Sequence, residues 1–227
     1  MKVTAQRVKK YFIPMMRCYG ELTFNNGVSD PLDFCFRHSS IRPLQVRSEL
    51  ERLAKIVATK KPGAAMEIGT CLGGTLFMLC QLASPTATII SLDLPNGPFG
   101  GGYTPLQLPL FKKFRRHQQR LHFLRCDSHS AETLASVKGI CGSGRLDYLF
   151  IDGDHTYEGV KQDFEMYSPL VRAGGVIAFH DVAEASMYYK VDSNVRKFWD
   201  EVKKRYAHEE IIEDQKQGWA GIGVLYL

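Results

Sequence analysis

The strongest constraint on the fold of this chain is an alternation of short apolar runs with segments of helical periodicity. The apolar runs are AAMEIG at 64–69, TIISLDL at 88–94, LHFLRCD at 121–127, LDYLFIDG at 146–153 and GGVIAFHD at 174–181. Segments such as 158–171 and 194–206 place their apolar residues on a single helical stripe. Strands that alternate with helices predict an α/β fold with a doubly wound, mostly parallel sheet. The closing GWAGIGVLYL at 218–227 predicts one more strand, antiparallel at the end of the sheet.

The N-terminal part of the chain has a different character. Residues 1–43 lack clear periodicity and carry turn signals such as NNG and SDP, which predicts an irregular arm or lid. Helical periodicity begins with LQVRSELERLAKIV at 44–57. We therefore expect an arm over 1–43 and one α/β domain over 44–227. The arm could make a subunit contact in a homo-oligomer or cover an active site, and the sequence leaves both alternatives open.

Composition narrows the class of protein. The 227 residues are 44% hydrophobic and 23% charged, which is ordinary for a globular protein with a real core. A net charge of +5, spread along the chain, does not indicate a nucleic-acid partner. Six scattered cysteines without a C-x-x-C pair are more typical of reduced thiols than of disulfides or a zinc site. Because no stretch is long enough for a membrane span and Pro14 and Arg17 interrupt any signal-like run, we expect a cytoplasmic location.

A carboxylate follows or ends each of the five predicted parallel strands. These residues are Glu67, Asp93, Asp127, Asp152 and Asp181. In an open α/β sheet, ligands bind beyond the carboxyl ends of the strands. Five carboxylates at that edge therefore predict an active site, and hence an enzyme.

The turn EIGTCLGG at 67–74 indicates which cofactor binds at this edge. Its spacing is G-x-x-x-G-G, whereas a dinucleotide-binding turn would read G-x-G-x-x-G. Glu67 also disfavours a pyrophosphate, because a carboxylate beside a helix N-terminus would repel it. S-adenosylmethionine has a cationic end and no phosphate, so we expect Glu67 and the turn residues Gly69, Thr70 and Gly73 to bind it.

The next two strand ends fit the remainder of the same cofactor. Asp93, which follows the second strand, is placed to accept both ribose hydroxyls. Asp127 and Ser128, which follow the third, are placed to bond the adenine amino group. Asp152 completes the predicted cofactor contacts. Each assignment has a plain alternative, because a strand-end Asp is often only a helix cap.

Several segments together resemble class I S-adenosylmethionine-dependent methyltransferases. They are EIGTCLGGTLF, SLDLPNGPFGGGY, DSHSAETL, LFIDGDHTYEGVKQDFEMYSPLVRAGGVIAFHD and GWAGIGVLYL. Within this superfamily the chain is similar to the cephalosporin-hydroxylase-like proteins and macrolide-sugar O-methyltransferases, from about Arg42 to the C-terminus. IDGDHTYEGV and GGVIAFHD are the segments specific to that branch. The resemblance implies methyl transfer to a hydroxyl of a small molecule, above all a sugar of a glycolipid, polysaccharide or natural product, while small phenols remain open.

Asp152 and Asp181 follow strands that would be neighbours in the sheet. Two carboxylates converging beside a methyl donor favour a hard divalent cation such as magnesium. The resemblance implies that Asp152 and Asp181 are its ligands and that His155, three residues after the first ligand, is the general base. Such a base would remove the proton of an acceptor hydroxyl whose pKa the metal lowers. Asp154 is interpreted as an orienting partner for His155 or as a cap on the following helix.

His180 departs from the pattern of these relatives, which have an acidic residue before the second metal ligand. Because adjacent strand residues point to opposite faces, His180 could turn away and pack. Alternatively it joins the metal site and favours a softer ion such as manganese or zinc, or the site has lost its metal. The segment 95–105 is either a flexible connector or a lid with Phe99 or Tyr103 as a platform for the substrate. Of the other histidines, His129 is the best candidate for a role at the adenine end.

Three alternative functions fit parts of this pattern. An NAD-dependent oxidoreductase would share the sheet, but the glycine spacing and Glu67 count against it. A metal-dependent phosphoesterase would need more clusters of His and Asp and would leave the glycine turn unexplained. A catalytically silent module that binds S-adenosylmethionine is disfavoured by the joint presence of Asp152, His155 and Asp181.

Overall fold

The computed structural model describes residues 12–24, 28–184 and 194–227. Within them lies one sheet of seven strands, in the order β3-β2-β1-β4-β5-β7-β6. The strands are β1 (Ala64–Ile68), β2 (Thr88–Leu92), β3 (Arg120–Leu124), β4 (Leu146–Ile151), β5 (Val171–His180), β6 (Ala207–Ile211) and β7 (Ile222–Tyr226). Strands β1 to β5 run parallel, which confirms the predicted α/β fold with a doubly wound, mostly parallel sheet.

The end of the sheet differs from the prediction in one respect. The C-terminal strand β7 is antiparallel to β5, as expected, but it is not the last strand. Strand β6 pairs antiparallel with β7 and forms the edge. Its sequence AHEEI is polar and mostly solvent-accessible, so it lacks the apolar run by which the other strands were recognised.

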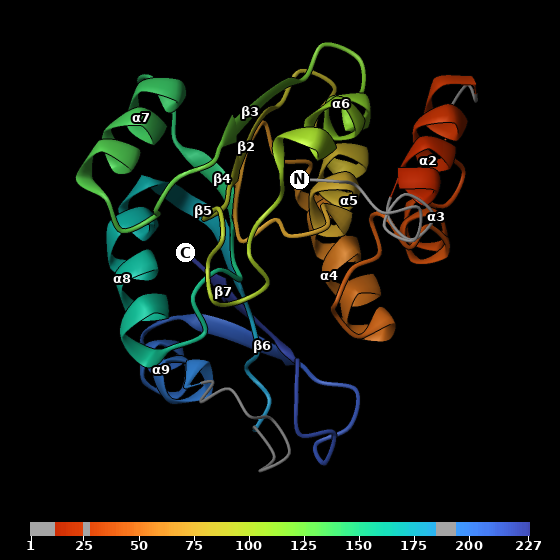
Figure 1. The fold of residues 1–227 in the computed structure, drawn as a ribbon. Helices are drawn as coiled ribbons and strands as arrows, with labels where there is room; N and C mark the ends of the chain where they lie inside the picture. The colour runs from red at the N-terminus through yellow and green to blue at the C-terminus, as the bar shows by residue number, and fades with distance from the viewer. Residues whose placement is uncertain (1–11, 25–27, 185–193) are drawn as a thin grey trace.

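Helices cover both faces of the sheet (Figure 1). They are α2 (Ile13–Phe24), α3 (Pro31–Arg37), α4 (Arg47–Lys60), α5 (Gly74–Leu82), α6 (Leu108–Phe111), α7 (Ala131–Cys141), α8 (Tyr157–Tyr167) and α9 (Val195–Val202). Helices α4, α5 and α6 lie on one face, with α2 and α3 outside them, and α7, α8 and α9 lie on the other. In the described part of the chain, no helix combines the length and the apolar character needed to cross a membrane.

Each face of the sheet has its own hydrophobic core. The alternation of side chains along a strand divides them: in β4, Tyr148 and Phe150 belong to the core under α4 and α5, whereas Leu149 and Ile151 belong to the core under α8 and α9. All four residues are at most 2% exposed. A strand buried on both faces is read as a continuous apolar run, which is why this strand was recognisable from sequence.

The prediction of an irregular segment before residue 44 is wrong for the described residues, which contain α2 and α3. Asp30 caps α3 by accepting the backbone N–H of Asp33 at 2.9 Å, and Pro31 occupies the first helical turn. The SDP signal therefore begins a helix rather than a simple turn. Phe34 of α3 is buried and stacks on Phe77 of α5, with ring centroids 5.1 Å apart. The helical segment thus packs on the α/β domain.

Candidate active site

The turn that follows β1 passes very close to the end of β4. Gly69 has a φ of +89°, and a Cβ built on it would lie 2.0 Å from the carbonyl oxygen of Asp152. Gly73 has a φ of +84°, and a Cβ there would lie 2.6 Å from the ring of Phe111. Both positions therefore require glycine. The two glycines predicted for cofactor binding are thus needed first to build the turn itself.

The carboxylate of Asp93 organises this turn. Its Oδ2 accepts the backbone N–H groups of Thr70 at 3.1 Å and Cys71 at 2.7 Å. The backbone N–H groups of Tyr103 and Leu94 also stabilise this carboxylate, which therefore ties the turn after β1 to the segment after β2. The hydroxyl of Thr70 turns inward and lies 2.7 Å from the hydroxyl of Ser91, so only the main chain of Thr70 faces the turn.

Glu67 lies beneath the turn, in the interior of the protein. Its side chain is 1% exposed, and Oε1 has no hydrogen-bond partner among the described residues. Burial raises the pKa of Glu67 to about 8, although the hydroxyls of Thr75 and Thr70 counteract the shift. Glu67 is absent from the linings of both cavities described below. Any effect of its charge on a ligand would therefore act through the turn.

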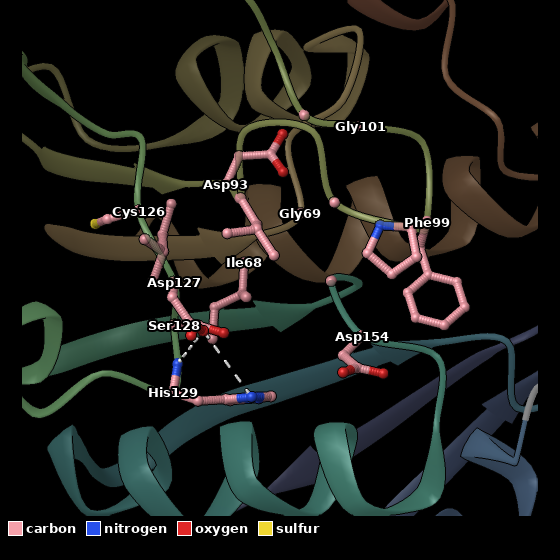
Figure 2. A pocket seen from close by; sticks show the side chains of 16 residues that line it. Ile68, Gly69, Asp93, Phe99, Gly101, Cys126, Asp127, Ser128, His129 and Asp154 are labelled. Carbon is pink, nitrogen blue, oxygen red and sulfur yellow. Dashed lines mark hydrogen bonds and ion pairs between the residues drawn. The ribbon is translucent and has the colours of Figure 1, made fainter.

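A small cavity of about 70 Å³ lies beyond the ends of β1, β2 and β3 (Figure 2). Its lining brings together Asp93, Asp127 and Ser128, the three residues predicted for the ribose and adenine of the cofactor. His129 also lines it, and its backbone N–H donates to Asp127 Oδ1 at 2.9 Å.

A larger cavity of about 730 Å³ shares the walls at Gly69 and Phe99 with the small one. Its polar side comprises Asp152, His155, His180 and Asp181. Other parts of the wall come from segments far away in sequence, and they include Phe36, Arg42, Leu44, Gln45 and Trp219. Two sequence regions outside the strand ends, 36–45 and 218–220, therefore shape the space in front of the predicted catalytic residues.

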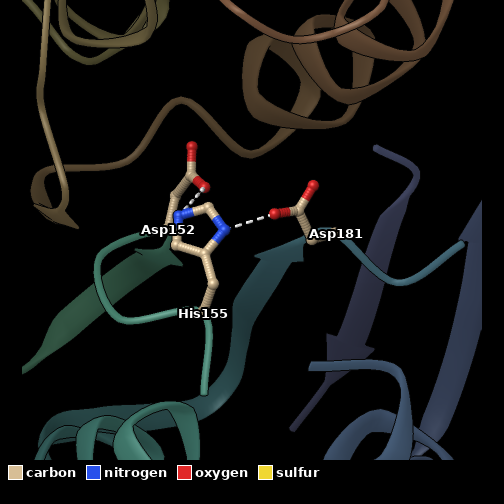
Figure 3. A group of neighbouring side chains, drawn as sticks. All are labelled: Asp152, His155 and Asp181. Atoms are coloured by element: carbon tan, nitrogen blue, oxygen red, sulfur yellow. Dashed lines mark hydrogen bonds and ion pairs between the residues drawn. The ribbon is translucent and has the colours of Figure 1, made fainter. Parts of the chain in front are cut away.

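Three of the predicted residues form a tight group at the ends of β4 and β5. Asp152, His155 and Asp181 each offer a ligand atom within 4.8 Å of the others (Figure 3). Nδ1 of His155 is hydrogen-bonded to Oδ2 of Asp181, and Nε2 lies 3.9 Å from Oδ1 of Asp152. The ring of Phe99 stacks on the imidazole with centroids 4.9 Å apart. The imidazole is thus held on three sides, with Nε2 directed toward Asp152.

The charges of this group perturb one another. Burial alone would lower the pKa of His155, but its hydrogen bond to Asp181 and the nearby charge of Asp152 outweigh it and raise the pKa. Burial would raise the pKa of Asp181, but the imidazoles of His180 and His155 lower it to about 2. Asp181 is therefore ionised, and the imidazole of His155 is a stronger base than a free imidazole.

His180 is buried and does not turn away from the site. Its Nδ1 lies 3.1 Å from Oδ1 of Asp152 and 3.2 Å from Oδ1 of Asp181, without the alignment of a hydrogen bond. Burial would lower the pKa of His180, but the two carboxylates raise it to about 9. The alternation of side chains along a strand does not hold here because β5 ends at His180. Asp181 has a φ of +61°, which turns its side chain to the same side as that of His180.

Two open interpretations are decided by contacts. Asp154 does not orient His155, whose partner is Asp181; it accepts the N–H of Thr156 at 2.8 Å in the turn before α8. Tyr103 is 1% exposed and packs edge-on against Phe111, so it cannot be a substrate platform. Phe99 is the aromatic residue of segment 95–105 that reaches both cavities.

Sequence reasoning missed two residues that support the group. The Nε2 of Gln45 donates to Oδ2 of Asp152 at 2.7 Å, across 107 positions of sequence. Glu49 is buried and accepts the backbone N–H of Gly221 at 3.0 Å, which fixes the segment that carries the wall residue Trp219. Glu49 could have been found from sequence, because it is a charged residue on an otherwise apolar helical stripe. Nothing in the sequence around Gln45 indicates that it contacts the site.

Comparison with known proteins gives the family. The model of a methyltransferase domain family matches residues 66–182, just over half of the chain. Among curated proteins, the uncharacterized protein R132 of Acanthamoeba polyphaga mimivirus is 32% identical over 118 residues, 51% of this chain and 50% of that protein. The uncharacterized protein y4gI of Sinorhizobium fredii is 27% identical over 129 residues, 56% of this chain and 14% of that protein. The chain thus matches half or less of the length of either relative.

Solved structures agree on the fold. The O-methyltransferase from Bacillus cereus in complex with SAH superposes with a TM-score of 0.61 at 14% identity, covering 93% of this chain and 97% of that one. The family match counts against the oxidoreductase and phosphoesterase alternatives. On the strength of residues 66–182, which carry the glycine turn, Asp152, His155 and Asp181, the chain belongs to the methyltransferase domain family.

Proposed function

We propose that the protein is an S-adenosylmethionine-dependent O-methyltransferase that acts on a hydroxyl of a small molecule. The observation that carries the proposal is the group Asp152, His155 and Asp181, which lines the larger cavity together with the glycine turn. The family match and the SAH named for the Bacillus cereus structure support the choice of cofactor.

The two cavities suggest a division of the site. The adenosine part of the cofactor would lie at the small cavity, with Asp93 toward the ribose and Asp127 and Ser128 toward the adenine. The main chain of the turn at Gly69, Thr70 and Gly73 would face the amino-acid part. Glu67, below the turn, would favour the cationic end through its charge when ionised. S-adenosylmethionine, when bound, supplies a methyl group on a positively charged sulfur.

His155 is proposed as the general base. Its hydrogen bond to Asp181 orients the imidazole, so Nε2 is the atom that accepts the proton of the acceptor hydroxyl. Asp152 lies beside that atom and stabilises the imidazolium that forms. The stacked ring of Phe99 keeps the imidazole in place. Holding oxygen and methyl donor in line is the remaining task of the cavity walls.

The residues present fit a divalent cation. Two carboxylates whose ligand atoms lie within 4.8 Å of each other, with an imidazole beside them, are suited to magnesium or manganese. Asp152 and Asp181 would hold the ion, which would lower the pKa of the acceptor hydroxyl. His180 faces both carboxylates, so we include it as a candidate ligand that would favour the softer ion.

The acceptor is proposed to be a sugar hydroxyl, following the similarity to macrolide-sugar O-methyltransferases. A cavity of about 730 Å³ with Phe36, Phe99 and Trp219 in its walls is large enough for a glycosylated small molecule and offers flat surfaces to a sugar or a phenol. The described part of the arm would help to cover this cavity, since Phe36 and Arg42 lie in its lining. Six free cysteines are consistent with a cytoplasmic enzyme.

The test is transfer of labelled methyl from S-adenosylmethionine to a panel of glycosides and phenols, with and without EDTA. Transfer to a glycoside that EDTA abolishes and Mg²⁺ restores would support the full proposal. Label that survives chelation would remove the metal role of Asp152 and Asp181. His155→Ala should lose transfer while retaining SAH affinity, and an unchanged rate would exclude His155 as the base.

A further inference from the structure

Asp163, on α8, is a buried carboxylate that the proposed reaction does not use. Its side chain is fully buried, and the side chains that stabilise its charge are the imidazole of His129 and the hydroxyl of Ser128. The nearest cationic group is the imidazole of His129, whose Nε2 lies 3.3 Å from Oδ1. A buried carboxylate needs a partner of this kind, because its transfer from water is otherwise costly.

His129 connects this carboxylate to the small cavity. The same Nε2 lies 3.2 Å from the carbonyl oxygen of Gly159, so it faces two acceptors and must carry a proton. The other ring nitrogen, Nδ1, lies 4.0 Å from Oδ1 of Asp127, which is too far for a hydrogen bond. Nδ1 is therefore available to a ligand in the cavity that His129 lines (Figure 2).

Helix α8 fixes the whole segment 127–129 from below. The hydroxyl of Tyr167 donates to the carbonyl oxygen of Ser128 at 2.7 Å, four residues after Asp163 on the same helix. The N–H of His129 closes the segment onto Asp127 at 2.9 Å. A rigid segment with one imidazole nitrogen that makes no hydrogen bond is suited to recognising a ligand group at a fixed position.

We propose that His129, positioned by Asp163, is a binding residue for the purine ring of the cofactor, donating from Nδ1 to a ring nitrogen. This proposal rests on the proposed function, because it takes the small cavity as the adenosine site. Asp163 acts through His129: it holds the imidazole in its protonated form and fixes its orientation.

The proposal makes cofactor affinity depend on pH. Asp163 and Asp127 raise the pKa of His129, so the imidazolium persists above its ordinary range. Asp154 also faces Asp163, and Asp93 lines the cavity on the far side, so every other charged group nearby is acidic. As pH rises through the pKa of the pair, the Nδ1 donor is lost and Asp163 is left as an unpaired buried charge. SAH affinity should then fall.

The experiment is calorimetric titration with SAH between pH 6 and 9, which needs no acceptor. His129→Gln keeps a polar side chain at a position only 22% exposed and should weaken SAH about tenfold at pH 6.5, with less pH dependence than wild type. His122→Gln, on β3 and outside both cavity linings, is the matched control and should follow wild type. The amino group of SAH titrates equally in all three proteins.

A second variant separates positioning from folding. Asp163→Asn should shift the pH at which affinity falls toward the ordinary range of histidine, with thermal unfolding confirming that the protein is folded. Unchanged SAH affinity and pH profile in His129→Gln would overturn this inference alone. Failure of wild type to bind SAH would overturn the proposed function with it, so the two failures are distinguishable.

Discussion

The close approach of the glycine turn to the end of β4 makes Gly69→Ala the sharpest test of the site geometry. The φ of +89° places Gly69 in the left-handed region, where an alanine costs roughly 1–2 kcal/mol. The new Cβ would also lie 2.0 Å from the carbonyl oxygen of Asp152, a backbone atom that no change of rotamer can move.

Relief of that contact requires the ends of β1 and β4 to separate. Separation would break the hydrogen bond from the N–H of Asp152 to the carbonyl oxygen of Ile68, now 2.8 Å long, at a cost of about 1 kcal/mol. The expected loss of unfolding free energy for Gly69→Ala is therefore about 2–3 kcal/mol, the sum of these two effects. The same displacement moves Asp152 relative to the turn, so SAH affinity should fall as well.

The assay is urea unfolding at equilibrium, with SAH titration on the folded variant. Gly139→Ala is the matched control, because a Cβ at this position of helix α7 meets no atom within 4 Å. Alanine replaces glycine there at ordinary helical geometry and should stabilise the protein by roughly 0.5–1 kcal/mol. The two substitutions are chemically identical and should have opposite signs. Equal stability of both variants, with unchanged SAH affinity, would refute the close approach.

Three further predictions concern single contacts. Burial raises the pKa of Glu67 from 4.5 to about 8 in the folded protein. The stability linked to this group is therefore fully present below pH 4.5 and is lost as pH rises through 8. Glu67→Gln removes this dependence, so its unfolding free energy in urea should rise relative to that of wild type as pH increases from 5 to 8. Phe99→Ala should lower the rate of methyl transfer more than SAH affinity, because the ring stacks on His155. A larger effect on SAH affinity would show that Phe99 acts mainly in cofactor binding. Gln45→Ala removes the donor to Asp152 and should lower the transfer rate about tenfold with a stability change within about 1 kcal/mol, whereas Gln45→Glu should be worse because it places a like charge beside the carboxylate.

The fold could be predicted where sequence pattern and burial coincide. Strand β4 is buried on both faces, and LDYLFI is apolar at nearly every position, so its recognition needed no knowledge of its neighbours. Strand β6 was missed because an edge strand with AHEEI can remain polar. Helix α3 was missed because SDP is both a turn signal and a capped helix start, and only the packing of Phe34 on Phe77 distinguishes them.

The site was predictable where function depends on strand ends. The carboxyl ends of parallel strands share one edge, so Asp152 and Asp181 could be brought together from sequence alone. The direction of His180 could not, because strand alternation holds only while the backbone stays extended. The positive φ of Asp181 ends that regularity at the functional position. A non-glycine residue in this region is uncommon, and the backbone strain it implies is typical of sites where function constrains the chain.

Two contacts that sequence could not supply involve segments outside the family match at residues 66–182. Gln45 reaches Asp152 directly, and Glu49 holds the backbone of Gly221 in the segment that carries Trp219. Gln45 and Trp219 line the larger cavity, whereas the strand ends carry its titratable groups. Because residues 36–45 and 218–220 supply part of the wall, acceptor choice can vary without altering Asp152, His155 or Asp181. Acceptor specificity should therefore respond to substitutions in these two wall segments, and methyl-transfer chemistry to substitutions at the strand ends.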